Sequence, residues 1–147
     1  FNLINDLSRD FAKKLELGAR DVAALIQHED IYQLSAFLPP EKEAEFLRRC
    51  PGCLAVRWED DFCDILPEGD GKPNGLAHTL AHLGLTREQC IAFGDGGNDV
   101  TMLDYAGIGV AMGNGEDALK QRADLVAPSN ELGGVADMLE LAIKGEI

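Results

Sequence analysis

The chain has 147 residues, 46% of them hydrophobic, which allows one ordinary hydrophobic core with a small additional lobe. Acidic residues outnumber basic ones by 26 to 13, and the net charge of −13 argues against nucleic acid or an anionic membrane surface as a partner. No stretch approaches the roughly 20 apolar residues of a membrane span and no secretory leader is apparent, so we expect a cytoplasmic protein. Four cysteines are too few for a disulfide scaffold, and we expect reduced thiols.

The first part of the chain mixes helical and strand patterns. In chain order, we expect two amphipathic helices, a strand, a helix that begins with two prolines, and two short strands, over residues 6–18, 19–29, 31–38, 39–50, 53–58 and 62–67. An acidic turn separates the last two strands, which favours an antiparallel hairpin. We therefore predict an α+β lobe over residues 1–67.

From residue 68 onward, helices and strands alternate strictly. The pattern predicts helix, strand, helix, strand, helix, strand and helix over residues 72–84, 90–94, 98–107, 108–113, 116–123, 124–128 and 131–145. Such alternation implies right-handed crossovers and a parallel sheet with helices on its faces. We therefore predict an α/β domain over residues 68–147, with its boundary in the segment PEGDGKP.

One stretch, IAFGDGGNDVTML, carries the strongest chemical signal. Ligands of open parallel sheets bind beyond the carboxyl ends of the strands, and the strand in this stretch ends directly before Asp95. Gly96 and Gly97 let the backbone turn towards a ligand, and Asp99 falls in the first turn of the next helix. Two carboxylates this close repel each other unless a cation lies between them or one is protonated. We therefore expect Mg²⁺ here, because this ion prefers oxygen ligands and attracts phosphate.

The simpler alternative is a glycine turn with an acidic helix start and no ligand, since acidic first turns are common. Two further features favour a site. Lys72 begins an earlier helix of the same half, from which its ammonium group can reach a phosphate held near Asp95. Gly113, Asn114 and Gly115 form a second loop at the next strand end, although an ordinary strand-to-helix turn also explains this loop.

Two segments of the second half resemble the C-terminal part of a haloacid dehalogenase (HAD) superfamily phosphatase of the Cof-type, subclass IIB branch: GDGKPNGL and IAFGDGGNDVTMLDYAGIGVAMGNGEDALKQRADLVAPSNELGGVADMLE. The preceding lobe is similar to the latter portion of that branch's cap. The resemblance implies a partial Rossmann-like core over 68–147 and part of an α+β cap over 1–67. It also implies a Mg²⁺-dependent phosphomonoester hydrolase that acts on a sugar phosphate or a similar small phosphorylated metabolite.

The resemblance further implies roles for four residues. Lys72 matches the lysine that pairs with the phosphate and the nucleophilic carboxylate, and Asn98 matches an asparagine that helps hold the phosphoryl group. Asp95 matches the aspartate that ligates Mg²⁺, and Asp99 matches the acidic partner that supports the metal directly or through water. In the family reaction an aspartate attacks phosphorus, and water hydrolyses the aspartyl-phosphate with a second aspartate as general acid and base.

The chain departs from the family pattern at the nucleophile. That residue comes from an Asp-x-Asp motif, and no two aspartates in this sequence are separated by one residue. We therefore expect the C-terminal portion of a larger phosphatase, inactive alone, whose nucleophile lies outside this chain. The strands are continuously apolar, which is typical of strands with neighbours on both sides. We therefore also expect an exposed sheet edge that self-associates or captures the missing N-terminal half.

Two alternative functions stay open. One is a non-catalytic pseudo-phosphatase or interaction module that keeps the metal loop without a nucleophile. The other is a zinc-stabilised binding domain, because Cys50 and Cys53 followed by His78 and His82 imitate a zinc pattern, although the 24 intervening residues exceed the roughly 12 to 15 of a compact finger. A redox role of the two cysteines lacks the preceding strand of a thioredoxin-like site.

Overall fold

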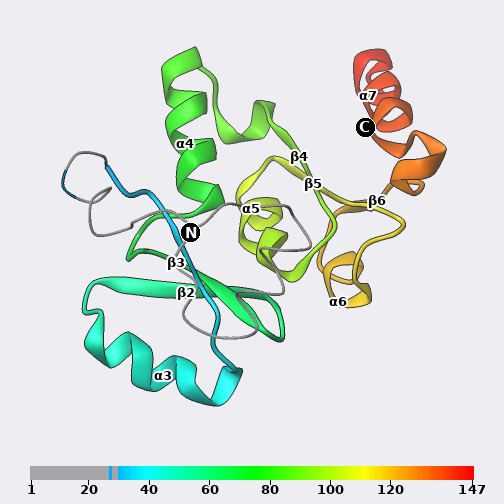
Figure 1. Cartoon of the computed structure of the whole chain (residues 1–147). Coiled ribbons are helices and arrows are strands. Elements are labelled where there is room, and N and C mark those ends of the chain that lie inside the picture. Colours follow the sequence, from blue (N-terminus) through cyan, green and yellow to red (C-terminus); the bar gives the residue numbers. More distant parts are fainter. Residues whose placement is uncertain (1–26, 28–29) are drawn as a thin grey trace. The chain divides into compact units, whose positions relative to one another are not determined.

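The computed structural model describes residue 27 and residues 30–147 (Figure 1). The helices predicted over 6–18 and 19–29 lie outside the described residues. The chain divides into two compact units between Glu68 and Gly69, one residue beyond the boundary that the sequence predicts.

In its described part, residues 30–68, the first unit contains a three-stranded antiparallel sheet and one helix. Its elements are β1 (Leu34–Ala36), α3 (Pro40–Arg49), β2 (Cys53–Glu59) and β3 (Phe62–Pro67). The strands lie in the order β1-β3-β2, and β2 and β3 form the predicted hairpin (Figure 1). The predicted strand at 31–38 is reduced to the three residues that pair with β3.

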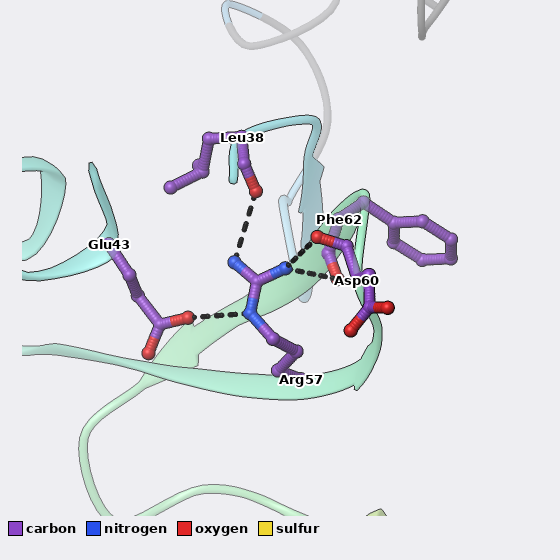
Figure 2. A network of polar contacts seen from close by, with 5 residues as sticks. All are labelled: Leu38, Glu43, Arg57, Asp60 and Phe62. Atoms are coloured by element: carbon purple, nitrogen blue, oxygen red, sulfur yellow. Dashed lines mark hydrogen bonds and ion pairs between the residues drawn. The ribbon is translucent and has the colours of Figure 1, made fainter. Parts of the chain in front are cut away.

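Arg57 connects the parts of this first unit (Figure 2). Its Nε donates to Glu43 Oε2 on α3 at 3.0 Å. Its Nη1 donates to the carbonyl oxygens of Asp60 at 2.9 Å and Phe62 at 3.2 Å, and its Nη2 donates to that of Leu38 at 3.0 Å. One guanidinium therefore ties the helix, the hairpin turn, the start of β3 and the segment before α3 together.

The second unit alternates helices and strands around a parallel sheet. Its helices and strands are α4 (Lys72–Leu83), β4 (Ile91–Gly94), α5 (Val100–Tyr105), β5 (Ile108–Ala111), α6 (Asp117–Lys120), β6 (Leu125–Val126) and α7 (Gly134–Lys144). Three short 3₁₀ turns complete it: η1 (Arg87–Gln89), η2 (Gly97–Asp99) and η3 (Asn130–Leu132). The strands lie parallel in the order β4-β5-β6. The predicted α/β class with a parallel sheet is confirmed.

Alternating side chains of the strands build one core cluster on each face of this sheet. On one face Ala92 and Ala111 pack with Leu103 of α5 and Leu119 of α6. On the other face the cluster is formed by Val110, Met112, Ala127 and Met138, the last from α7. Helices therefore cover both faces, as the alternating pattern predicts.

Several boundaries differ from the sequence prediction. The helix expected over 98–107 is a 3₁₀ turn, η2, followed by the shorter α5. The helix expected over 131–145 is likewise preceded by η3, and Gly133, with a φ of 76°, separates η3 from α7. Glycine adopts this left-handed conformation without a steric penalty, so the chain turns there instead of continuing one helix. Within the described residues, no helix combines the length and the apolar character that a bilayer crossing requires.

Candidate active site

The candidate site begins at the carboxyl end of β4. Gly94 is the last residue of this strand and Asp95 follows it, as the sequence predicts. Asp95 is exposed, and among the described residues no group donates a hydrogen bond to its carboxylate. Its carboxylate therefore keeps both oxygens available for a ligand.

Asp99, by contrast, is buried and fully engaged. Only 5% of its surface is exposed. Its Oδ2 accepts hydrogen bonds from the backbone N–H groups of Asp95 at 2.9 Å and Gly96 at 3.1 Å, and its Oδ1 pairs with Lys72 Nζ. Asp99 therefore fixes both the loop after β4 and the first residue of α4.

The environment of Asp99 favours its ionised form. Burial alone raises the pKa of this carboxyl, but the hydrogen bonds from Lys72 and from the backbone of Gly96 and Asp95 outweigh burial and hold the pKa below its ordinary value of 3.8. Lys72 contributes from a side chain that is itself 45% exposed. The pair is thus an anchored carboxylate with a cation whose remaining N–H donors can reach a ligand.

A glycine at position 94 is required for this arrangement. A Cβ on Gly94 would lie 2.5 Å from Asp99 Cβ and 2.9 Å from Leu103 Cδ1, both closer than carbon atoms can approach. The absent side chain lets η2 and α5 pack directly against the strand end. The close approach of Asp99 to β4 therefore depends on the residue that precedes Asp95.

The loop after β5 braces the loop after β4. The N–H of Glu116 donates to the carbonyl oxygen of Asp95 at 2.9 Å, and Glu116 Oε1 accepts from the N–H of Gly97 at 2.9 Å. A Cβ on Gly115 would lie 2.8 Å from the same Asp95 carbonyl oxygen. Glu116 was not predicted from the sequence, since an acidic residue at a helix start carries no signal of a contact 19 positions away.

The two asparagines at the strand ends differ in their contacts. Asn114 Oδ1 accepts a hydrogen bond from the N–H of Asn130 at 2.9 Å, so this side chain joins the loop after β5 to the start of η3. Asn98 is half-buried beside Gly96, and a Cβ on that glycine would lie 3.2 Å from Asn98 Oδ1. The predicted role of Asn98 on a phosphoryl group stays a prediction.

The donor set fits a hard cation in part. Oxygen ligands suit Mg²⁺, and Asp95 offers a free carboxylate, whereas both oxygens of Asp99 already have partners. In the described part of the chain, no group of three or more His, Cys, Asp or Glu residues is gathered around one point. If a metal binds here, these residues could offer one direct carboxylate ligand, Asp95, and one supporting carboxylate, Asp99, whereas the described residues give the zinc alternative no support.

Comparison with known proteins extends this picture. Residues 7–139 match the sequence pattern of haloacid dehalogenase-like hydrolases. The 5-amino-6-(5-phospho-D-ribitylamino)uracil phosphatase YitU of Bacillus subtilis is 48% identical over 125 residues, which are 82% of this chain and 44% of that protein.

Solved structures give the same result. BT1666 of Bacteroides thetaiotaomicron, a phosphatase of the haloalkanoate enzyme superfamily, aligns with a TM-score of 0.84 and 28% identity over 93% of this chain and 52% of its own. The HAD subclass IIB sugar phosphatase BT4131 aligns with a TM-score of 0.77 and 31% identity over 97% of this chain and 55% of its own. The chain thus spans about half of these structures, and 44% or less of several curated relatives.

Proposed function

Because the chain belongs to the family of haloacid dehalogenase-like hydrolases, we propose that it is part of a Mg²⁺-dependent phosphomonoester hydrolase. The observation that carries the proposal is the cluster at the end of β4, in which the buried Asp99 carboxylate holds Lys72 beside the loop that presents Asp95. An anchored cation next to an unpartnered carboxylate suits a ligand that combines a phosphoryl group with a divalent metal.

Each residue has a distinct task in this proposal. Asp95 ligates Mg²⁺, and Asp99 supports the metal site through water while it holds Lys72 in position. The Lys72 ammonium group stabilises negative charge on the phosphoryl oxygens, and Asn98 donates a hydrogen bond to one of them. The bound metal neutralises charge that develops on the phosphoryl group.

The nucleophile belongs to polypeptide outside these 147 residues. The absence of an Asp-x-Asp motif supports this, as does the span of about half of the related structures. In the proposed reaction, the missing aspartate attacks phosphorus and forms an aspartyl-phosphate, which water then hydrolyses. Lys72 is placed next to that carboxylate, where it also keeps the nucleophile ionised.

An unpaired strand edge and a set of exposed apolar side chains support an additional packing partner for the second unit. Among the described strands, β4 pairs on one side only, with β5. Residues 135, 139 and 143 are apolar at helical spacing along α7, and between 40% and 87% of each is exposed, while Leu132 in η3 is 74% exposed. We propose that the rest of the phosphatase core covers these surfaces, and that the isolated chain self-associates through them.

We propose a sugar phosphate or a similar small phosphorylated metabolite as the substrate. The subclass IIB sugar phosphatase and the phosphoribityl-uracil phosphatase among its relatives support this class. The lysine and metal neutralise phosphate charge locally, so the net charge of −13 does not oppose such a ligand.

The test is a hydrolysis screen of small phosphomonoesters with the full-length protein beside the 147-residue chain, each with Mg²⁺ and with a chelator. We expect metal-dependent release of phosphate by the full-length protein and none by the chain. Equal activity of the two would disprove an external nucleophile, and an inactive full-length protein would favour the non-catalytic alternative. Sedimentation and thermal melting of the 147-residue chain test the proposed self-association. A monomer that unfolds in one sharp transition would contradict it.

A further inference from the structure

Within the first unit, two cysteines lie in one tight turn. Cys50 follows the last residue of α3 and Cys53 begins β2. The N–H of Cys53 donates to the carbonyl oxygen of Cys50 at 3.2 Å, and Gly52 has a φ of 80°. With Pro51 as the second residue and a positive φ at the third, this is a type II β-turn.

This turn brings the Cα atoms of the two cysteines to about the separation that a disulfide spans. The end residues of a β-turn have Cα atoms less than about 7 Å apart, and disulfides span Cα separations of about 4.4 to 6.8 Å. The N–H of Glu68 donates to the carbonyl oxygen of Gly52 at 2.7 Å, and Cys53 pairs with Pro67 across the sheet. The turn is thus anchored, and both thiols are only half-buried.

Cys50 also borders a surface hollow of about 510 Å³. The hollow is lined by Leu38, Lys42, Glu45, Phe46, Arg49 and Cys50. Within the described residues, neither Lys42 nor Arg49 forms an ion pair, so two positive charges face this hollow against one negative charge. In a protein of net charge −13, the hollow is a local site that attracts a small anionic reagent.

The other two cysteines lie in different surroundings. Cys63 is fully buried in β3, and Cys90 is half-buried before β4. Burial raises the pKa of both thiols above its ordinary value, which reduces their reactive thiolate at neutral pH. They serve as internal controls in the same chain.

We propose that Cys50 and Cys53 form a reversible redox site that exchanges with a low-molecular-weight disulfide bearing carboxylates, such as glutathione disulfide. Cys50 attacks one sulfur of that disulfide, forms a mixed disulfide in the hollow and releases one small thiol. Cys53 then attacks the Cys50 sulfur, forms the Cys50–Cys53 bond and releases the second small thiol. One disulfide is thus reduced as one is formed. The site does not depend on the proposed phosphatase function.

The first test measures the redox state of the pair directly. The chain is equilibrated in mixtures of reduced and oxidised glutathione, quenched in acid, alkylated and digested with trypsin. Cleavage after Arg49 and Arg57 places both cysteines in one peptide without Cys63 or Cys90. We expect this peptide to lose two hydrogens as the mixture becomes more oxidising, and to recover both alkyl groups on reduction. A peptide that stays doubly alkylated throughout would overturn the proposal.

Single substitutions test the order of attack. Cys53→Ser removes the resolving thiol, so we expect a stable glutathione adduct on Cys50. Cys50→Ser leaves only Cys53, and we expect a slower adduct because the hollow borders Cys50. Adduct formation at the buried Cys63 and the half-buried Cys90 is measured in the same samples. Adduct formation at Cys50 no faster than at Cys90 would contradict the proposal.

Charge reversal of the reagent tests the hollow. Lys42→Gln and Arg49→Gln should each slow the reaction with glutathione disulfide roughly 2- to 5-fold, the factor expected for a surface charge pair. The same variants should not slow the reaction with cystamine, which carries two ammonium groups. Arg48→Gln is the matched control, because Arg48 is in the last turn of α3 but does not line the hollow. Equal slowing with both reagents would exclude recognition by charge.

Discussion

Each unit has a charged side chain that several hydrogen-bond partners surround, Arg57 in the first unit and Asp99 in the second. The two centres differ in which charged groups stay accessible to a ligand. In the first unit all three nitrogens of Arg57 are engaged, by Glu43 and by three backbone carbonyls of the same lobe (Figure 2). In the second unit Asp99 is equally engaged, yet its partner Lys72 is 45% exposed and the adjacent Asp95 is exposed as well.

The Arg57 network therefore stabilises its own unit, whereas the Asp99 cluster also presents charged groups to solvent. A guanidinium whose three nitrogens all donate within its own lobe stabilises that lobe. A buried carboxylate that positions an exposed cation beside an exposed carboxylate leaves both of these groups accessible to a ligand. Substitutions in the two centres should therefore affect different quantities.

The largest effect is expected at Lys72. Lys72→Ala removes the cation that faces the phosphoryl oxygens, and we expect kcat/KM of the full-length protein to fall about 100- to 1000-fold, or about 2.7 to 4 kcal/mol. Lys144→Ala is the control, because Lys144 lies on the surface of α7 and, among the described residues, forms an ion pair with Glu140 alone. A Lys72→Ala enzyme as active as the Lys144→Ala enzyme would remove the lysine from the site.

Asp99→Asn should affect stability as well as activity. The amide cannot accept from two backbone N–H groups and pair with Lys72 as the carboxylate does, so we expect the free energy of unfolding to fall by about 1 to 3 kcal/mol in urea titrations. Asp104→Asn removes a carboxylate that pairs with Arg122 at the surface, at 2.5 Å, and should lower stability by about 1 kcal/mol or less. Equal losses of stability in the two variants would mean that the contacts of Asp99 contribute no more than a surface ion pair.

Arg57→Lys should lower stability only. Lysine keeps the positive charge but lacks the planar fork that reaches Glu43 and three carbonyls together, so we expect a loss of about 1 kcal/mol. The kcat of the full-length protein should be unchanged, measured beside Lys72→Ala. A large loss of kcat with intact stability would place Arg57 in the reaction and erase the distinction between the two centres.

The smallest effect is a pH dependence that Asp99 introduces. Its pKa is lower in the folded state than in the unfolded state, so its contribution to stability is complete above its unfolded pKa, about 4. That contribution is lost as the pH falls through the folded pKa. Urea titrations from pH 6 downwards should therefore show a steeper decline in the wild-type chain than in Asp99→Asn. Parallel declines would contradict the assigned direction.

The proximity of Lys72, Asp95 and Asp99 was easier to predict from the sequence than the Arg57 network, and their roles stay predictions. Asp95, Asp99 and Lys72 were identifiable because strand ends, glycine turns and helix starts leave local patterns, and parallel strands bring their carboxyl ends to one edge. The distinction between the exposed Asp95 and the buried Asp99 was not predictable, because it depends on how closely η2 packs against Gly94.

The Arg57 network left no pattern in the sequence. Three of its partners are backbone carbonyls, which every residue carries, so no residue type signals the contact. The same reason hides Glu116, whose partners are the backbone of Asp95 and Gly97. The 3₁₀ turns before α5 and α7 likewise follow from the close packing at Gly94 and the left-handed Gly133 rather than from periodicity.

The most direct test of the central claim is the Mg²⁺ dependence of phosphomonoester hydrolysis by the full-length protein with Asp95→Asn. Asparagine keeps the shape of the side chain and removes the charge that ligates the metal, so we expect hydrolysis to fall at least about 100-fold with little change in stability. Asp104→Asn, measured under the same conditions, should hydrolyse at the wild-type rate. An Asp95→Asn protein with wild-type rate and metal dependence would contradict the account.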